Sequence, residues 1–195
     1  MPVGMLFFTA CGKSSDASST VTTIGSAASI VSSDINATMA PSPTTLKSIN
    51  NSIATVLKTD VQTKNEKEAT TFTKETQYCD ISGLKESINT GTLVKITKTQ
   101  TFNACKNSQY LQNGYLKIDY SQMNSEGKFP KIVQLTVQED FTFNDLLLKK
   151  GTVIDSTIEY NVDNSIKSVS ITSSGVVTYQ YGTYSLTNNS DTVTY

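Results

Sequence analysis

The chain has 195 residues, a formal net charge of −1 and an apolar fraction of 37%, which is below the roughly 45–50% of typical globular chains. All sixteen basic residues are Lys, and the sequence contains no Arg, His or Trp. Arg is a common phosphate ligand, His a common general base and metal ligand, and Trp a common interface anchor. This composition argues against acid–base catalysis, transition-metal binding and nucleic-acid recognition, so we expect no catalytic residues, no metal and no cofactor.

The first eleven residues form a short apolar run that ends in small residues directly before Cys11. A secretory signal has this order because the peptidase needs small side chains beside the cleavage site. The segment Phe8-Thr9-Ala10-Cys11 resembles the lipobox of bacterial lipoprotein precursors, although Phe8 stands where Leu is usual and no Lys or Arg precedes the run. The resemblance implies that residues 1–11 are a signal-peptide remnant and that a lipid on Cys11 anchors the protein. The alternative is that Leu6–Phe8 form a buried strand and that Cys11 is an ordinary thiol.

The same resemblance suggests a location in the cell. Gly12 follows the cysteine, so the chain lacks the Asp that retains lipoproteins in the inner membrane. The family pattern therefore implies the outer membrane. The membrane is then one partner through the lipid, an envelope protein is a second candidate partner, and nucleic acid is not expected.

Residues 12–44 are rich in hydroxyl side chains. Ser and Thr make up 15 of the 34 residues from Gly12 to Thr45. Such a segment buries too little apolar surface to offset the entropy lost on ordering. We expect a disordered linker with a mean span of roughly 30 Å.

Residues 45–66 are predicted to form an amphipathic helix. Pro41 and Pro43 mark the end of the linker, and Thr44 or Thr45 is expected to cap the helix. The apolar side chains fall on one helical stripe, which consists of Leu46, Ile49, Ile53, Val56, Leu57 and Val61. We interpret the stripe as a surface that docks on the following domain, with a coiled coil or a membrane contact as alternatives.

Residues 67–195 change to a period near two and are predicted to form an antiparallel β domain. The strand-like runs are Leu93–Phe102, Tyr115–Tyr120, Ile132–Val137, Asp140–Phe143, Thr152–Tyr160, Ser168–Thr172, Val176–Leu186 and Thr192–Tyr195. The predicted turns are Asn113-Gly114, Glu126-Gly127, Lys150-Gly151, Asp163-Asn164, Ser174-Gly175 and Asn188-Asn189. Such short connections favour hairpins, because parallel strands need long crossovers. The predicted fold is mainly β, an antiparallel meander preceded by one helix and a disordered stalk. An open curved sheet, a sandwich and a barrel are all compatible with the pattern.

Cys79 and Cys105 are the two cysteines that remain once Cys11 carries a lipid. An exported chain meets an oxidising compartment in which thiols pair, so we expect a disulfide between them. This bridge would close a loop of about 27 residues, worth roughly 3.5 kcal/mol in the chain-entropy model. A metal or redox site is the alternative, but it would need further Cys or His ligands or a close Cys-x-x-Cys pair.

The residues around these cysteines show a second resemblance. The stretch from Tyr78-Cys79-Asp80-Ile81-Ser82-Gly83 through Cys105 to Asn113-Gly114-Tyr115-Leu116 resembles a pattern in uncharacterised lipoproteins of Gram-negative bacteria. In that pattern two cysteines flank a hairpin and an Asn-Gly turn opens the next strand. The resemblance implies no particular activity.

Two carboxylate pairs are candidates for acid–base chemistry. Glu139 with Asp140, or Asp155 with Glu159, could supply the two groups of a glycosidase. Seventeen acidic residues make such pairs commonplace in this chain, so we interpret them as solvated strand edges. Without His, a nucleophilic Ser or Cys would have only Lys or a carboxylate as its base, and we expect that the protein is not an enzyme.

Three tyrosines near the C-terminus form a candidate interaction surface. On a regular strand, Tyr179 and Tyr181 would share one face and Tyr184 would lie on the other. Tyr rings on a sheet can bind sugars or partner proteins. The alternative is that these rings line the apolar face of the sheet.

Two functions therefore follow from the sequence. The first is a non-catalytic binding or structural module of the cell envelope. The second is a carrier of lipid or another apolar ligand, similar in element order to the envelope lipoprotein-carrier fold, in which a helix covers a curved sheet. An apolar cavity beneath the helix would discriminate between them.

Overall fold

The computed structural model describes residues 38–62, 73–92, 94–123 and 129–195, all within the unit Asp34–Tyr195. This part of the chain holds one helix, α1 (Pro43–Gln62), and one nine-stranded antiparallel sheet. Its strands are β1 (Thr73–Tyr78), β2 (Ser82–Thr92), β3 (Lys95–Lys106), β4 (Leu111–Met123), β5 (Pro130–Phe143), β6 (Leu146–Leu148), β7 (Val153–Tyr160), β8 (Ile166–Tyr179) and β9 (Gly182–Thr194). The predictions for Cys11, the lipobox and the linker up to residue 37 lie outside the described residues.

The strands form a meander in which sequence neighbours pair. The order is β1-β2-β3-β4-β5, then β6 and β7, then β8 and β9. β6 and β7 share one position, because β5 pairs with β6 through Phe141–Phe143 and with β7 through Ile132–Thr136. No pairing joins β1 to β9 among the described residues, so the meander is an open sheet. The predicted fold class is confirmed.

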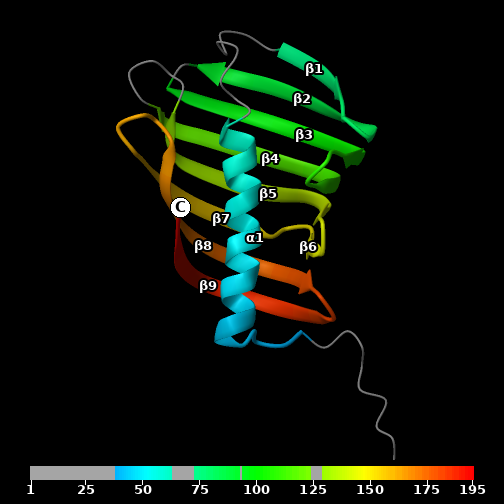
Figure 1. The fold of residues 1–195 in the computed structure, drawn as a ribbon, viewed down its shortest axis with the longest axis vertical. Helices are drawn as coiled ribbons and strands as arrows, with labels where there is room; N and C mark the ends of the chain where they lie inside the picture. The colour runs from blue at the N-terminus through cyan, green and yellow to red at the C-terminus, as the bar shows by residue number, and fades with distance from the viewer. Residues whose placement is uncertain (1–37, 63–72, 93, 124–128) are drawn as a thin grey trace, which may run out of the picture. The chain divides into compact units, whose positions relative to one another are not determined.

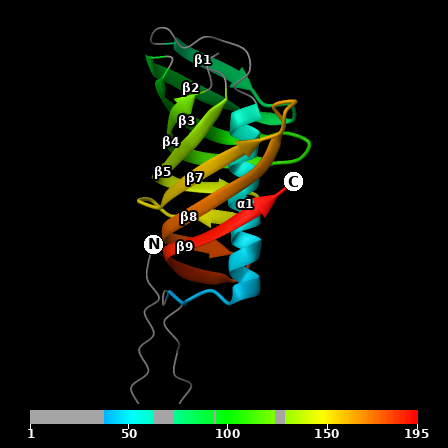
Figure 2. The ribbon, with the colours of Figure 1, turned by 90° about the vertical axis from the view of Figure 1, so that its left-hand side faces the viewer.

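The helix lies across the strands on one face of the sheet (Figure 1), and the view turned by 90° shows the sheet curving beside it (Figure 2). Pro43 occupies the first helical position, where its missing N–H costs nothing. The cap is Ser42, whose Oγ accepts the N–H of Thr45 at 3.2 Å, so the prediction of Thr44 or Thr45 as the cap is wrong. A hydroxyl one residue before Pro43 can reach the free N–H groups of the first turn.

The predicted stripe of α1 faces the sheet. Ile49, Ile53 and Leu57 are fully buried in one cluster with the inner side chains of the strands. The sheet contributes residues such as Leu116, Leu135, Ile154, Ile171 and Val177 to this cluster. The stripe therefore docks on the sheet, and α1 covers a face that an open sheet would otherwise expose.

A row of backbone irregularities crosses the sheet from β2 to β9. The register shifts at Gly83, between Phe102 and Cys105, at Gly114 and at Ser174. Neighbouring irregularities lie against each other, since a Cβ on Gly83 would lie 2.1 Å from the Ala104 carbonyl oxygen and a Cβ on Gly114 would lie 2.2 Å from the Asp140 carbonyl oxygen. Bulges bend and twist a strand locally, so an aligned row of them lets the whole sheet curve.

This row explains three errors in the predicted turns. Asn113-Gly114 and Ser174-Gly175 are bulges inside β4 and β8, and Asn188-Asn189 lies within β9. The actual turn after β8 is Gln180-Tyr181, in the middle of a run predicted as one strand. Glycine and Asn permit a positive φ in a bulge as readily as in a turn, so the residue types alone did not separate the two.

The other turn predictions had different outcomes. Turns occur as predicted at Lys150-Gly151 and Asp163-Asn164, while Glu126-Gly127 lies outside the described residues. The strand-like runs predicted from the sequence do not include β1, β2 or the short β6. The inner face of β1 and β2 is polar, so these strands lack the apolar alternation by which strands are recognised.

Candidate functional site

The helix-facing side of the sheet changes character from β4 to β1. On β4 it carries Leu116, Ile118 and Tyr120, all buried in the core. On β3 and β2 the cross-strand register places polar side chains at the equivalent positions, namely Lys98, Gln100, Lys85 and Ser87. The apolar cover by α1 therefore gives way to a polar inner surface toward the β1 edge.

A buried ion pair marks the boundary between the two surfaces. Asp60 lies in the last turns of α1, and its Oδ1 accepts a hydrogen bond of 2.8 Å from Lys98 Nζ. Both side chains are only 9% exposed. The hydroxyl of Tyr120 donates to the other carboxylate oxygen of Asp60. Burial, and then the negative charge of Asp60, raise the pKa of Tyr120 well above its ordinary value, so this hydroxyl stays protonated and remains a donor.

Next to this ion pair, a cleft of about 120 Å³ lies between α1 and strands β1–β4. We call it the polar cleft. Its apolar wall contains Val56, Phe102, Leu116 and Ile118, and its polar wall contains Gln77, Lys85, Gln100 and Gln112. The volume is room for about four water molecules, which suits a very small ligand.

Lys85 is a charged side chain of the cleft that forms no ion pair or hydrogen bond with any described residue. Burial, followed by repulsion from Lys98, lowers its pKa below the ordinary value, although Asp60 and Glu75 act in the opposite direction. The ammonium is therefore less stabilised here than in water.

Gln112 is the second side chain in the polar cleft with unused hydrogen-bonding capacity. It is 9% exposed, and its side-chain amide makes no hydrogen bond with the residues that the structure describes. Buried amides are normally satisfied. An amide that opens on a cleft can be satisfied by water or by a ligand.

The predicted disulfide is present at the edge of the polar cleft. Cys79 and Cys105 are bonded, with their Cα atoms 5.4 Å apart, and both line the cleft. Cys79 follows β1 and Cys105 lies in β3, so the bridge ties the edge strand to the third strand.

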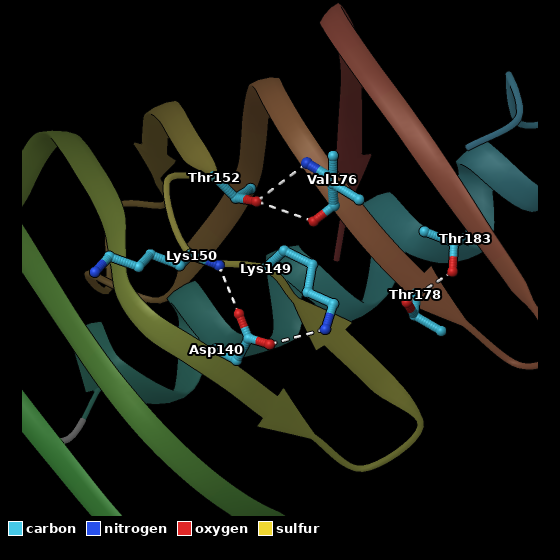
Figure 3. A network of polar contacts seen from close by, with 7 residues as sticks. All are labelled: Asp140, Lys149, Lys150, Thr152, Val176, Thr178 and Thr183. Carbon is cyan, nitrogen blue, oxygen red and sulfur yellow. Dashed lines mark hydrogen bonds and ion pairs between the residues drawn. The ribbon is translucent and has the colours of Figure 1, made fainter. Parts of the chain in front are cut away.

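The predicted carboxylate pairs serve the backbone and the outer surface. Asp140 accepts Lys149 Nζ and the N–H of Lys150, both at 2.8 Å (Figure 3). These two hydrogen bonds lower the pKa of Asp140 and fix the break between β6 and β7. The carboxylate of Asp155 accepts Gln134 Nε2, and Glu159 accepts the Ser168 hydroxyl. All four acidic side chains are exposed, which agrees with their interpretation as solvated strand edges.

The three tyrosines do not share a surface in the predicted way. Tyr179 and Tyr184 are half-buried and both pack against the core, while Tyr181 is fully exposed at the turn. The expectation that Tyr179 and Tyr181 occupy one face is wrong, because the turn at Gln180-Tyr181 interrupts the strand. Of the three, only Tyr181 presents its ring to solvent.

A second hollow, of about 290 Å³, lies at the turn between β7 and β8. Its lining includes Val61 at the helix end, Phe129, Tyr160 and the exposed turn residues Asp163–Ser165. The Tyr160 hydroxyl donates to the Pro130 carbonyl at 2.9 Å, and burial raises its pKa. The hollow is a surface feature and does not extend beneath the middle of α1.

In the described ranges, no group of three or more His, Cys, Asp and Glu side chains is arranged to hold a metal ion. No helix in the same part of the chain combines the length and the apolar character that crossing a membrane requires. Comparisons of the chain with family models, curated proteins and solved structures found no match.

Sequence reasoning missed the polar cleft, although a signal was present. Lys98 and Gln100 stand between Ile96 and Phe102 at alternating positions, which share one face of a strand. Asp60 likewise lies three residues after Leu57, on the apolar stripe of the helix. Charged or amide side chains at inward positions indicate either a buried polar network or a site.

Proposed function

We propose that the protein is a membrane-anchored envelope lipoprotein whose β domain is a non-catalytic binding module. The observation that carries the proposal is the division of the inner face. Apolar side chains of α1 fill the region over β4–β8, and the polar cleft of about 120 Å³ lies between the helix and strands β1–β4. Drug-sized and lipid-like ligands occupy cavities of about 300–1,000 Å³, so this interior suits recognition of small polar groups better than transport of lipid.

The anchor rests on the lipobox-like segment that ends at Cys11. Metabolic labelling with a fatty-acid probe tests it directly. The wild-type chain should incorporate the probe and fractionate with membranes, and Cys11→Ala should do neither. Equal labelling of the two chains would refute the anchor.

A carrier of an apolar ligand is the second candidate. Two observations favour it, namely a helix laid over one face of an open curved sheet and a hollow of about 290 Å³ beside the end of that helix. Under the binding-module proposal, Cys11→Ala chains purified without detergent should carry far less than one lipid each, as measured by solvent extraction and mass spectrometry. One lipid per chain would favour the carrier.

A further inference from the structure

We infer that the polar cleft binds a small carboxylate that carries a second hydrogen-bonding group, with Lys85 holding the carboxylate and Gln112 the second group. This inference deepens the binding-module proposal by naming the chemical class of its ligand. It rests on two polar groups, brought together by β2 and β4, that have no partner among the described residues.

The charges around the cleft favour an anion at Lys85. Of the two lysines on this inner surface, Lys98 is already paired with Asp60 at 2.8 Å. Asp60 is occupied further by the Tyr120 hydroxyl, and Asp80 is exposed to solvent at the rim. Asp60 and Glu75 attract the half-buried ammonium of Lys85 from a distance, but neither forms an ion pair with it. A carboxylate beside it would form a charge-assisted hydrogen bond in a partly desolvated site.

Gln112 adds the requirement for a second group. Its amide offers both a donor and an acceptor, so a hydroxyl on the ligand satisfies either atom. It is more than nine-tenths buried and opens into the same cleft. Between the polar groups, Phe102 and Leu116 present an apolar wall, which suits a short carbon chain. A cleft with room for about four waters accommodates a molecule of the size of 3-hydroxypropionate.

Titration of the isotope-labelled full chain, followed by NMR, tests the inference. Three probes differ by one group each: 3-hydroxypropionate, its neutral amide 3-hydroxypropionamide, and propionate, which lacks the hydroxyl. We expect 3-hydroxypropionate to bind most tightly and to shift the backbone signals of Lys85, Phe102 and Gln112. A hydrogen bond to a charged group contributes about tenfold or more in affinity, so the amide should bind at least tenfold more weakly.

Two variants test which group of the ligand Lys85 and Gln112 each bind, and a third variant is the control. Lys85→Met should bind 3-hydroxypropionate about tenfold more weakly and lose the preference for it over the amide. Gln112→Leu should retain that preference but lose the preference over propionate. Lys74→Met removes an exposed lysine on neighbouring β1, whose ammonium pairs with Glu86, and should bind like the wild type.

Absence of any response in the wild type, or equal affinity of wild type and Lys85→Met, would overturn the inference. Melting curves recorded for each variant identify any that fails to fold. The result is separate from the anchor test, because loss of labelling at Cys11 leaves the titration unchanged and loss of ligand binding leaves the labelling unchanged.

Discussion

Two lysines on the same inner surface of the sheet differ in whether an ion pair compensates the burial of their charge. Lys98 is 9% exposed and pairs with Asp60, which also accepts the Tyr120 hydroxyl. Lys85 is only half-buried and forms no ion pair with the described residues. Burying an ion pair costs desolvation free energy that the attraction between the two charges only partly offsets. Burying a single charge without a partner costs more free energy. Lys98 is therefore expected to be structural and Lys85 to be available for function.

Replacement of Lys98 by Met should strongly destabilise the fold. It removes the ammonium that lies 2.8 Å from the buried Asp60 carboxylate, and loss of one partner of a buried pair costs about 3–5 kcal/mol. Lys117→Met is the matched control, because Lys117 binds Asp119 at 2.7 Å but is 42% exposed, and such pairs contribute about 1 kcal/mol or less. Urea unfolding measures both. Equal losses in the two variants would show that burial of the pair is not what matters.

Replacement of Lys85 by Met should stabilise the protein at neutral pH. Folding lowers the pKa of Lys85 from 10.5, so the unfolded chain holds this proton more tightly. The wild type therefore gains stability as pH rises from the folded pKa towards 10.5. The advantage of Lys85→Met at pH 7 should shrink across that window, as followed by unfolding at several pH values. A variant that is less stable than wild type at pH 7 would contradict this.

At the level of elements, the row of bulges is what allows one sheet to curve. The contacts run from Gly83 against the Ala104 carbonyl, through Gly114 against the Asp140 carbonyl, to Gly175 against Thr152. Side chains reinforce the row, since Asp140 holds the N–H of Lys150 and the Thr152 hydroxyl bonds the Val176 backbone (Figure 3). The bend therefore depends on close backbone approach at a few glycines.

Alanine at Gly114 should cost much more stability than alanine at Gly151. Both glycines have positive φ values, +117° and +84°, but a Cβ at Gly151 meets nothing within 4 Å. Gly151→Ala should therefore cost only the left-handed penalty of about 1–2 kcal/mol. Gly114→Ala adds a clash with the Asp140 carbonyl oxygen at 2.2 Å, which forces β4 and β5 apart. Chemical denaturation compares the two, and equal losses would argue against close packing at the bulge.

The sequence predicted the elements whose apolar side chains follow a simple period. The stripe from Leu46 to Val61 predicted α1 and its docking, and Tyr115–Tyr120 fall within β4. The prediction of a turn at Asn113-Gly114 is wrong, because a positive φ suits a turn and a bulge alike and the difference depends on the pairing with β5. The polar cleft was missed for a related reason. Lys85 and Gln112 come to line the same cleft only through strand register, which one sequence does not specify.

At the level of the whole described unit, contacts distant in sequence hold the edges of the meander. Met39, just before the helix, pairs with Tyr184 on β9. The ring of Tyr195 lies beneath the Lys58 ammonium at 3.8 Å, which brings the C-terminus onto α1. At the other edge, β1 contributes little to the core, since its side chains are exposed from Lys74 to Tyr78. The disulfide is the covalent link that holds this edge.

Removal of the disulfide should therefore destabilise the β domain through its β1 edge. The bridge joins residues 26 apart in sequence, and loss of such a cross-link is worth roughly 3.5 kcal/mol in the chain-entropy model. For a chain of this size, that loss corresponds to a fall of about 7–14 °C in melting temperature. Calorimetry of the oxidised wild type and of the double variant Cys79→Ser with Cys105→Ser measures it. Reductant should lower the melting of the wild type towards that of the variant and leave the variant unchanged. Because Cys79 and Cys105 also line the polar cleft, the variant should bind 3-hydroxypropionate more weakly even at temperatures where it is fully folded. Unchanged melting in a confirmed oxidised sample would show that the β1 edge is held by other contacts.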